Sequence, residues 1–129
     1  YSAGTGKVIA LETLNTANSS MDHDALGSTL GSFDSRMGSI RTSTLADLRA
    51  KTTQKNAVQV GLGAFAASIA FPSAAMTSFT PPDLRLKSGG GATDVGQVLP
   101  GINDGFSGTK PDAGAYELGA ALPVYGPRI

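Results

Sequence analysis

The chain has 129 residues, of which 16% are charged and 6% aromatic, and it contains 17 Gly, no Trp and no Cys. Ten basic residues balance ten acidic ones, so the charge gives no reason to expect a nucleic-acid partner or an anionic membrane surface. The lack of cysteine excludes disulfides and thiolate metal sites. Because small side chains dominate, a core would bury little apolar area per residue. We therefore expect residues 1–129 to form a single domain or a fragment.

The first third of the chain predicts one strand followed by loops. Lys7–Leu14 is a compact apolar run that favours a strand, with a helix as the alternative because Ala, Leu and Glu are helix formers. Residues 15–38 are rich in Ser, Asn, Gly and Asp, which is typical of loops. Within them, Met21–Asp24 is a candidate for a short strand or a turn. Residues 1–43 are thus expected to be a strand plus a loop region.

A short helix is predicted at Leu45–Lys51, within residues 44–51. Thr44 is placed to cap the first turn while Asp47 reaches back, a variant of the capping box. Asp47 and Lys51 have the i,i+4 spacing of a helical ion pair.

The remaining part, residues 58–129, predicts short strands and then mostly turns. Val58–Gly63 alternates apolar and small or polar residues with the period of a half-buried strand. Ser68–Phe71 is a second candidate strand, and Leu84–Lys87 alternates again. Beyond Gly89 nearly everything indicates turns.

The chain shows no segment that predicts a membrane span or a signal peptide. The apolar stretch Val58–Ala75 is interrupted by polar residues, glycines and Pro72, which excludes a spanning helix. The sequence starts at Tyr1 without an initiator Met, so we expect it to begin inside a longer product.

Motifs near the C-terminus occur in a specific order. The Leu84–Lys87 segment precedes a Gly/Ser turn and the A-x-D-x-G motif at Ala92–Gly96. A linker at Val98–Phe106 leads to a P-D-x-G-A-Y-E motif at Pro111–Glu117, and the chain ends with Leu122–Arg128. This arrangement resembles the C-terminal end of secreted bacterial right-handed parallel β-helix proteins of the pectate-lyase-like superfamily.

The resemblance implies a mainly β fold consisting of the terminal rungs and cap of a right-handed parallel β-helix, with long loops and one short helix. It also implies a secreted or cell-surface protein that binds or processes polysaccharides. The catalytic groove of such proteins lies on central rungs, which would precede Tyr1, so we expect no catalytic residue here. The implied partners are preceding β-helix rungs or other protein chains, and possibly a polysaccharide.

Within the motifs, a structural cap is expected. Asp94 and Asp112 each precede a Gly by two residues, and short carboxylates in turns accept backbone N–H groups while Gly takes a positive φ. Tyr116 is expected to bury its ring and keep its hydroxyl bonded. Six residues make up this predicted structural motif: Asp94, Gly96, Asp112, Gly114, Tyr116 and Glu117.

Asp22 and Asp24 flank the only histidine, His23. On a strand they would share a face and could bind Ca²⁺ together with backbone carbonyls. A solvated polar turn is the simpler interpretation, and we favour it. No cofactor is expected apart from this possible calcium ion.

Other charged residues allow alternative interpretations. Arg85 and Lys87 fall on one predicted strand face and could contact an acidic sugar, although such residues are more often a solvated face. Asp104, Asp112 and Glu117 could be paired acids for glycoside cleavage, but their place within the C-terminal motifs favours a structural role.

The sequence allows three alternative functions. The first is a non-catalytic capping part of an extracellular β-helix protein associated with polysaccharides. The second is a stand-alone structural subunit of a larger assembly, completed by strand pairing with neighbouring chains, most readily at Lys7–Leu14. The third is a polysaccharide lyase or glycoside hydrolase. In the first two cases the chain is not expected to be a lone monomer.

Overall fold

The computed structural model describes residues 7–13, 17–70, 78, 80 and 82–122. Its elements are β1 (Lys7–Leu11), β2 (Ala25–Leu26), β3 (Asp34–Met37), β4 (Ile40–Thr42), α1 (Leu45–Lys51), β5 (Val58–Gln59) and the 3-10 turn η1 (Leu62–Ala64). A mainly β chain with one short α-helix therefore agrees with the sequence prediction. Both sheets formed by these strands are open, and no described helix has the length and hydropathy of a membrane span.

Two pairs of strands are parallel although they lie far apart in the sequence. β1 pairs in parallel with β3, which forms an antiparallel hairpin with β4. β2 pairs in parallel with β5, with Ala25 opposite Val58. Parallel neighbours require the chain to cross back before it pairs again. Segments that are far apart in the sequence therefore lie side by side.

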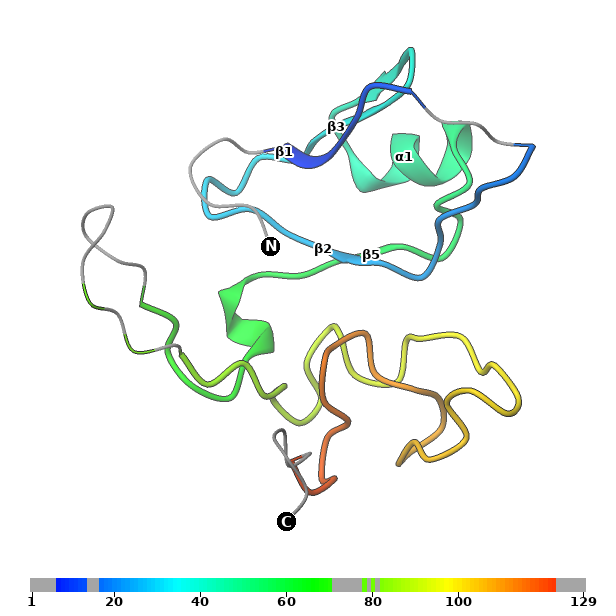
Figure 1. Ribbon diagram of the computed structural model, residues 1–129. Coiled ribbons are helices and arrows are strands. Elements are labelled where there is room, and N and C mark those ends of the chain that lie inside the picture. Colours follow the sequence, from blue (N-terminus) through cyan, green and yellow to red (C-terminus); the bar gives the residue numbers. More distant parts are fainter. Residues whose placement is uncertain (1–6, 14–16, 71–77, 79, 81, 123–129) are drawn as a thin grey trace.

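Later parts of the chain return beside β5 without forming a strand (Figure 1). A Cβ added to Gly91 would lie 3.4 Å from Cγ1 of Val60 and 3.8 Å from the Gln59 carbonyl oxygen. The Ala92 carbonyl then accepts a 2.8 Å hydrogen bond from the Ala113 amide. We call these neighbouring stretches, residues 25–26, 58–60, 91–92 and 113, the stack, and each stretch a pass.

The main core lies between α1 and the β1–β3 layer. Its buried side chains are Ile9, Phe33, Met37, Leu48 and Ala57, and Leu48 has no exposed surface. From η1 onward, few apolar residues are buried. In that part of the described chain they are Ala64, Leu86, Ala92 and Pro111. Apolar burial therefore holds the first part of the chain more strongly than the last.

The hairpin of β3 and β4 and the strand β2 are findings that the sequence did not predict. Loop was expected for residues 15–38, yet β2 and β3 lie within them. In β3 the buried positions are Ser35 and Met37. Because Ser35 is polar, the sequence does not show the alternation of apolar and polar residues that predicts a strand. Ser35 is accommodated because its hydroxyl bonds the Thr42 hydroxyl at 2.6 Å. Gly38, at φ +62°, opens the two-residue turn as a type II′ hairpin requires.

The strands predicted in the second half are shorter or absent. β5 ends at Gln59, and Leu62 begins the 3-10 turn instead of continuing a strand. Residues 68–70 form no strand, and the 84–87 segment contributes only an antiparallel bridge between Leu86 and Phe65. Gly61 and Gly63 bring no side chains to pack, which weakens a strand. Leu14, Phe71 and residues 123–129, which earlier predictions included, lie outside the described residues.

Helix α1 has the predicted bounds and the predicted N-cap. The Thr44 side-chain oxygen accepts the Asp47 amide at 3.1 Å. The predicted back-contact of Asp47 is replaced by an ion pair, with Lys51 Nζ 3.1 Å from Asp47 Oδ1. The helix ends at Thr52, whose hydroxyl donates to the Leu48 carbonyl at 2.7 Å.

Replacing Thr44 with Ala should lower the free energy of unfolding by about 1 kcal/mol, because the Asp47 amide loses its acceptor. Urea unfolding followed by circular dichroism measures the loss. Ser43→Ala is the matched control, since this neighbouring hydroxyl is exposed and does not cap the helix. Equal losses in the two variants would contradict the capping role of Thr44.

Candidate functional site

The turn at Asp22–Asp24 fastens one pass of the chain to the next. Asp22 Oδ1 accepts the Asn56 amide at 2.6 Å, and Asp22 Oδ2 accepts Asn56 Nδ2 at 2.7 Å. Asp24 accepts a hydrogen bond from the fully buried side chain of Gln54. Burial raises the pKa of Asp22, but the hydrogen bonds from Asn56 and from the His23 amide outweigh it and lower the pKa. The carboxylates therefore bind backbone and amide groups of the following turn.

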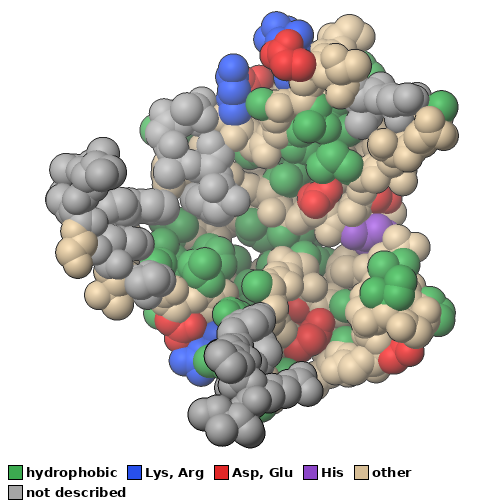
Figure 2. All heavy atoms as spheres, viewed as in Figure 1, with side chains coloured by type: hydrophobic (Ala, Val, Ile, Leu, Met, Phe, Trp, Pro, Cys, Tyr) green, Lys and Arg blue, Asp and Glu red, His purple; other side chains and the backbone are tan. Residues whose placement is uncertain are grey.

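His23 connects this turn to the later part of the chain. It takes a left-handed backbone conformation, with φ +61°, and its Nδ1 lies 3.2 Å from the Val95 carbonyl oxygen. Figure 2 shows the single histidine (purple) between the upper and lower halves of the molecule, with carboxylate side chains beside it. A contact over 72 residues of sequence thus joins the two halves.

Asp94 holds a second turn. Its Oδ1 accepts the Thr109 amide at 2.7 Å and the Lys110 amide at 3.1 Å. These bonds, led by the one from Lys110, lower the pKa of Asp94. Gly108 has φ +98°, and a Cβ there would lie 2.4 Å from the same oxygen. Only glycine therefore allows the chain to approach Asp94 so closely.

Asp112 links Asp94 to the last described turn. It is buried, its Oδ1 accepts the Asp94 amide at 2.8 Å, and its Oδ2 accepts the Leu118 amide at 2.7 Å. Its own amide donates to Glu117 Oε1 at 2.9 Å. We call these three acidic residues, Asp94, Asp112 and Glu117, the carboxylate network. They bind backbone donors of three segments.

The two motif glycines serve close packing, which corrects the predicted positive φ at these positions. Neither Gly96 nor Gly114 has a positive φ; Asp94 itself does, at +57°. The Gly96 amide donates to the Pro111 carbonyl at 2.7 Å, and a Cβ on Gly96 would lie 2.7 Å from that same oxygen. A Cβ on Gly114 would lie 3.1 Å from Cδ1 of Leu86.

Arg85 and Lys87 are not brought to one cavity. Arg85 forms a two-pronged contact with Asp83, with Nη2–Oδ2 at 2.6 Å and Nε–Oδ1 at 3.0 Å. The side-chain hydrogen bonds of this contact lower the pKa of Asp83 and raise that of Arg85. Arg85 lines a cavity with the half-buried Tyr116, whereas Lys87 borders a different one. A joint contact with an acidic sugar stays a prediction.

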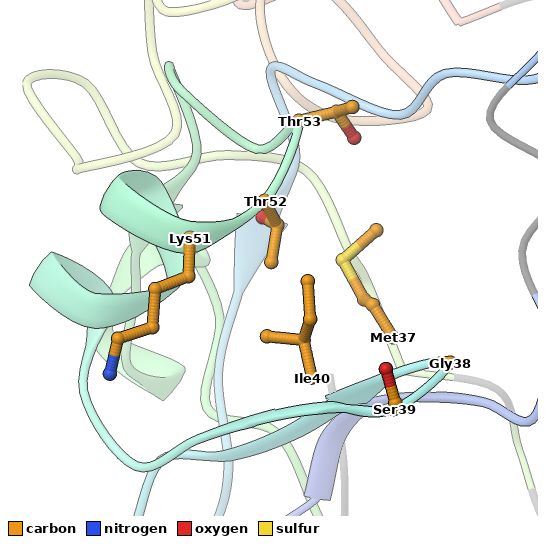
Figure 3. Close-up of a pocket in the computed structure, with 7 residues that line it drawn as sticks. All are labelled: Met37, Gly38, Ser39, Ile40, Lys51, Thr52 and Thr53. Carbon is orange, nitrogen blue, oxygen red and sulfur yellow. The ribbon is translucent and has the colours of Figure 1, made fainter.

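A cavity of about 310 Å³ lies between the β3–β4 turn and the end of α1 (Figure 3). The side chains of Met37 and Ile40 lie on one wall, opposite Thr52. Lys51 points away from them and pairs with Asp47. The lining also carries the hydroxyls of Ser39 and Thr53, and the buried Thr53 hydroxyl has no hydrogen-bond partner among the described residues.

A calcium site at Asp22 and Asp24 stays a prediction. In the described part of the chain, no three His, Asp or Glu side chains gather as metal ligands would. Both carboxylates already accept hydrogen bonds from the turn at residues 54–56. The sequence did not predict the hydrogen bonds of Gln54 and Asn56, because 30 or more residues separate these donors from their acceptors.

Asp94→Asn should alter the acid sensitivity of folding. Because the folded-state pKa of Asp94 is lowered from 3.8, its stabilisation is present above that value and lost as the pH falls through the folded-state pKa. Between about pH 6 and pH 2, the urea midpoint should be lower for the variant at pH 6. It should then decrease less steeply with falling pH than the midpoint of the unmodified chain. Asp34→Asn is the control, because that carboxylate has no hydrogen bond within the described residues. A slope equal to that of the unmodified chain would contradict this role.

Calcium should leave the thermal midpoint unchanged, because Asp22 and Asp24 are already occupied by protein donors. The test is a thermal melt with about 5 mM CaCl₂, above the Kd of weak extracellular calcium modules. Equal ionic strength of NaCl is the reference. A rise that occurs with calcium and disappears in Asp22→Asn would instead identify a calcium site.

Comparison with models of protein families, with curated proteins and with solved structures gives no match. The likeness of the C-terminal motifs to β-helix proteins therefore stays a prediction from motif order.

Proposed function

We propose that the chain is the structural, non-catalytic end of an extracellular parallel β-helix. The observation that carries this proposal is the repeated return of the chain to the stack. Val58 lies 33 residues after its partner Ala25, Gly91 lies 31 residues after its neighbour Val60, and Ala113 lies 21 residues after its partner Ala92. Solenoid proteins are built in this way, since each repeat contacts only its neighbours.

The turns between passes support the same interpretation. The Asp22–Asp24 turn forms hydrogen bonds with the turn at residues 54–56, which lies 30 to 34 residues further along the chain. The Val58 amide donates to the Asp24 carbonyl at 2.9 Å, directly beside the β2–β5 pair. Side chains and backbone thus fasten equivalent positions of successive passes. Such contacts compensate for the small apolar area of this chain.

The carboxylate network supports a capping role for the last passes. The end of a solenoid exposes unpaired backbone groups, which must be covered to prevent edge-to-edge association. Asp112 accepts the amides of Asp94 and Leu118, so two backbone donors are satisfied by one buried side chain. Because Asp112 and Glu117 are engaged in this way, the network supports a structural role for them rather than the glycoside cleavage considered above.

The edge strands at the opposite end of the stack offer a place for a partner strand to pair. β1 and β2 each lie at an edge of their sheet in the described structure. A preceding rung of the same protein would pair with these two edges. Secretion and an association with polysaccharides complete the proposal, and they depend on the resemblance of the motifs.

A second candidate function uses the same edges. A neighbouring chain that adds a strand to β1 or β2 would make the protein a structural subunit of an assembly. The two candidates differ in whether the added strand belongs to the same polypeptide. Both require that the isolated chain does not persist as a lone monomer.

Light scattering of the isolated chain tests this requirement. We expect self-association or aggregation through β1, and Ala10→Lys should reduce it, because a lysine in the middle of an edge strand opposes pairing. Ala50→Lys is the matched control, since Ala50 is also exposed but lies on α1. A monodisperse monomer with a cooperative melt at about 45–65 °C would refute the proposal. If both lysine variants reduced self-association equally, β1 would not be the strand through which the chain associates.

A further inference from the structure

A cavity of about 280 Å³ lies where the turn after α1 faces the Asp94 turn. Its walls carry three cationic side chains from separate segments: Arg49 on α1, Lys55 on the following turn, and Lys110 near the C-terminal motif. His23 and Asn56 also line it, and Asp94 is the one carboxylate on its wall. The segments that bring these groups together are 61 residues apart in sequence, from Arg49 to Lys110.

The cations of this cavity form no ion pair with a carboxylate among the described residues. The ion pairs of the described residues involve Arg36, Lys51 and Arg85, and none of them involves a cation of the cavity. Asp94 uses its Oδ1 for the backbone amides of Thr109 and Lys110. Among the lining residues, three cations therefore accompany one carboxylate, Asp94, while the Asp22 carboxylate lies behind the wall and accepts hydrogen bonds from Asn56.

Two of the cations are held in place by backbone carbonyls. Arg49 donates through Nε and Nη2 to the Ala57 carbonyl, which leaves Nη1 for another acceptor. Lys55 Nζ donates to the carbonyls of Arg49 at 2.8 Å and Ala50 at 3.2 Å, and it retains a third proton. Carbonyls orient a cation but do not cancel its charge. The site is therefore positioned before any ligand arrives.

The third cation, Lys110, has no side-chain partner among the described residues. Its backbone is fixed because its amide donates to Asp94 at 3.1 Å. Its ammonium group is thus free to turn toward the other two. An acceptor with several oxygens would satisfy the remaining N–H groups of all three side chains.

We propose that this cavity binds an oxyanion, either a small inorganic anion or one acidic unit of a saccharide. Its volume lies just below the usual range for ligand pockets, about 300–1,000 Å³, so it has room for a small anion or for one saccharide unit. Arg49, Lys55 and Lys110 provide the charge, and Asn56 and His23 provide polar walls. This site differs from the Arg85 and Lys87 pair and does not depend on the proposed β-helix.

The experiment measures binding of sodium sulfate and of trigalacturonate to the full chain by NMR titration at constant ionic strength. We expect both anions to shift amide signals around Asn56, Val95 and Lys110. Lys110→Gln should weaken binding about two- to fivefold, as expected for one partly exposed ion pair. The double variant Lys55→Gln/Lys110→Gln should abolish measurable binding.

Lys87→Gln is the matched control, because it removes the same charge from an exposed lysine that borders another cavity. Thermal melts verify that each variant is folded, which matters for Lys55 because it bonds carbonyls of α1. Tighter binding of trigalacturonate identifies a saccharide acid, and tighter binding of sulfate identifies a free ion. Either result supports the site. Absence of binding by both anions, equal weakening by Lys87→Gln, or equal binding of uncharged maltotriose would overturn it.

Discussion

The fold depends on satisfying backbone hydrogen-bond groups in a chain with few large apolar side chains. Eight buried hydrophobic residues in the described structure include three alanines. Burial of polar backbone groups is unfavourable unless each finds a partner. Here short carboxylates provide many of those partners across passes, with Asp22 bonding Asn56 and Asp112 bonding Asp94 and Leu118. A charge-assisted bond to an amide is stronger than a neutral one, so a few acids stabilise a loop-rich structure.

Close approach of the backbone follows from the same constraint. A carboxylate or carbonyl bonds an amide of the next pass only where no side chain intervenes. At Gly96 against Pro111 and at Gly108 against Asp94, a Cβ would collide with an acceptor from another segment of the chain. These two glycines therefore serve close contacts between segments of the chain. The same turns bring Arg49, Lys55 and Lys110 together, so the proposed oxyanion site is a product of the stacking.

Local features were predictable from the sequence and distant ones were not. Helix α1 was predicted to the residue because Thr44 and the i,i+4 pair of Asp47 and Lys51 act within one or two turns. The β3–β4 hairpin was missed because the inward Ser35 is polar and needs Thr42 to be satisfied. Motif order singled out Asp94 and Asp112 but assigned the positive φ to the wrong residues. No local pattern pointed to Asn56 or Lys110, whose roles appear only when passes meet.

Residue-resolved hydrogen exchange of the isolated chain tests the stacking most directly. The amides of Val58, Val60, Gly96 and Ala113 bond carbonyls of neighbouring passes. If the passes form one cooperative stack, these four amides should open together, with a common free energy of opening at the level of global unfolding. Unprotected amides at Gly96 and Ala113, alongside protected amides at Val58 and Val60, would show that the last passes are not part of the stack.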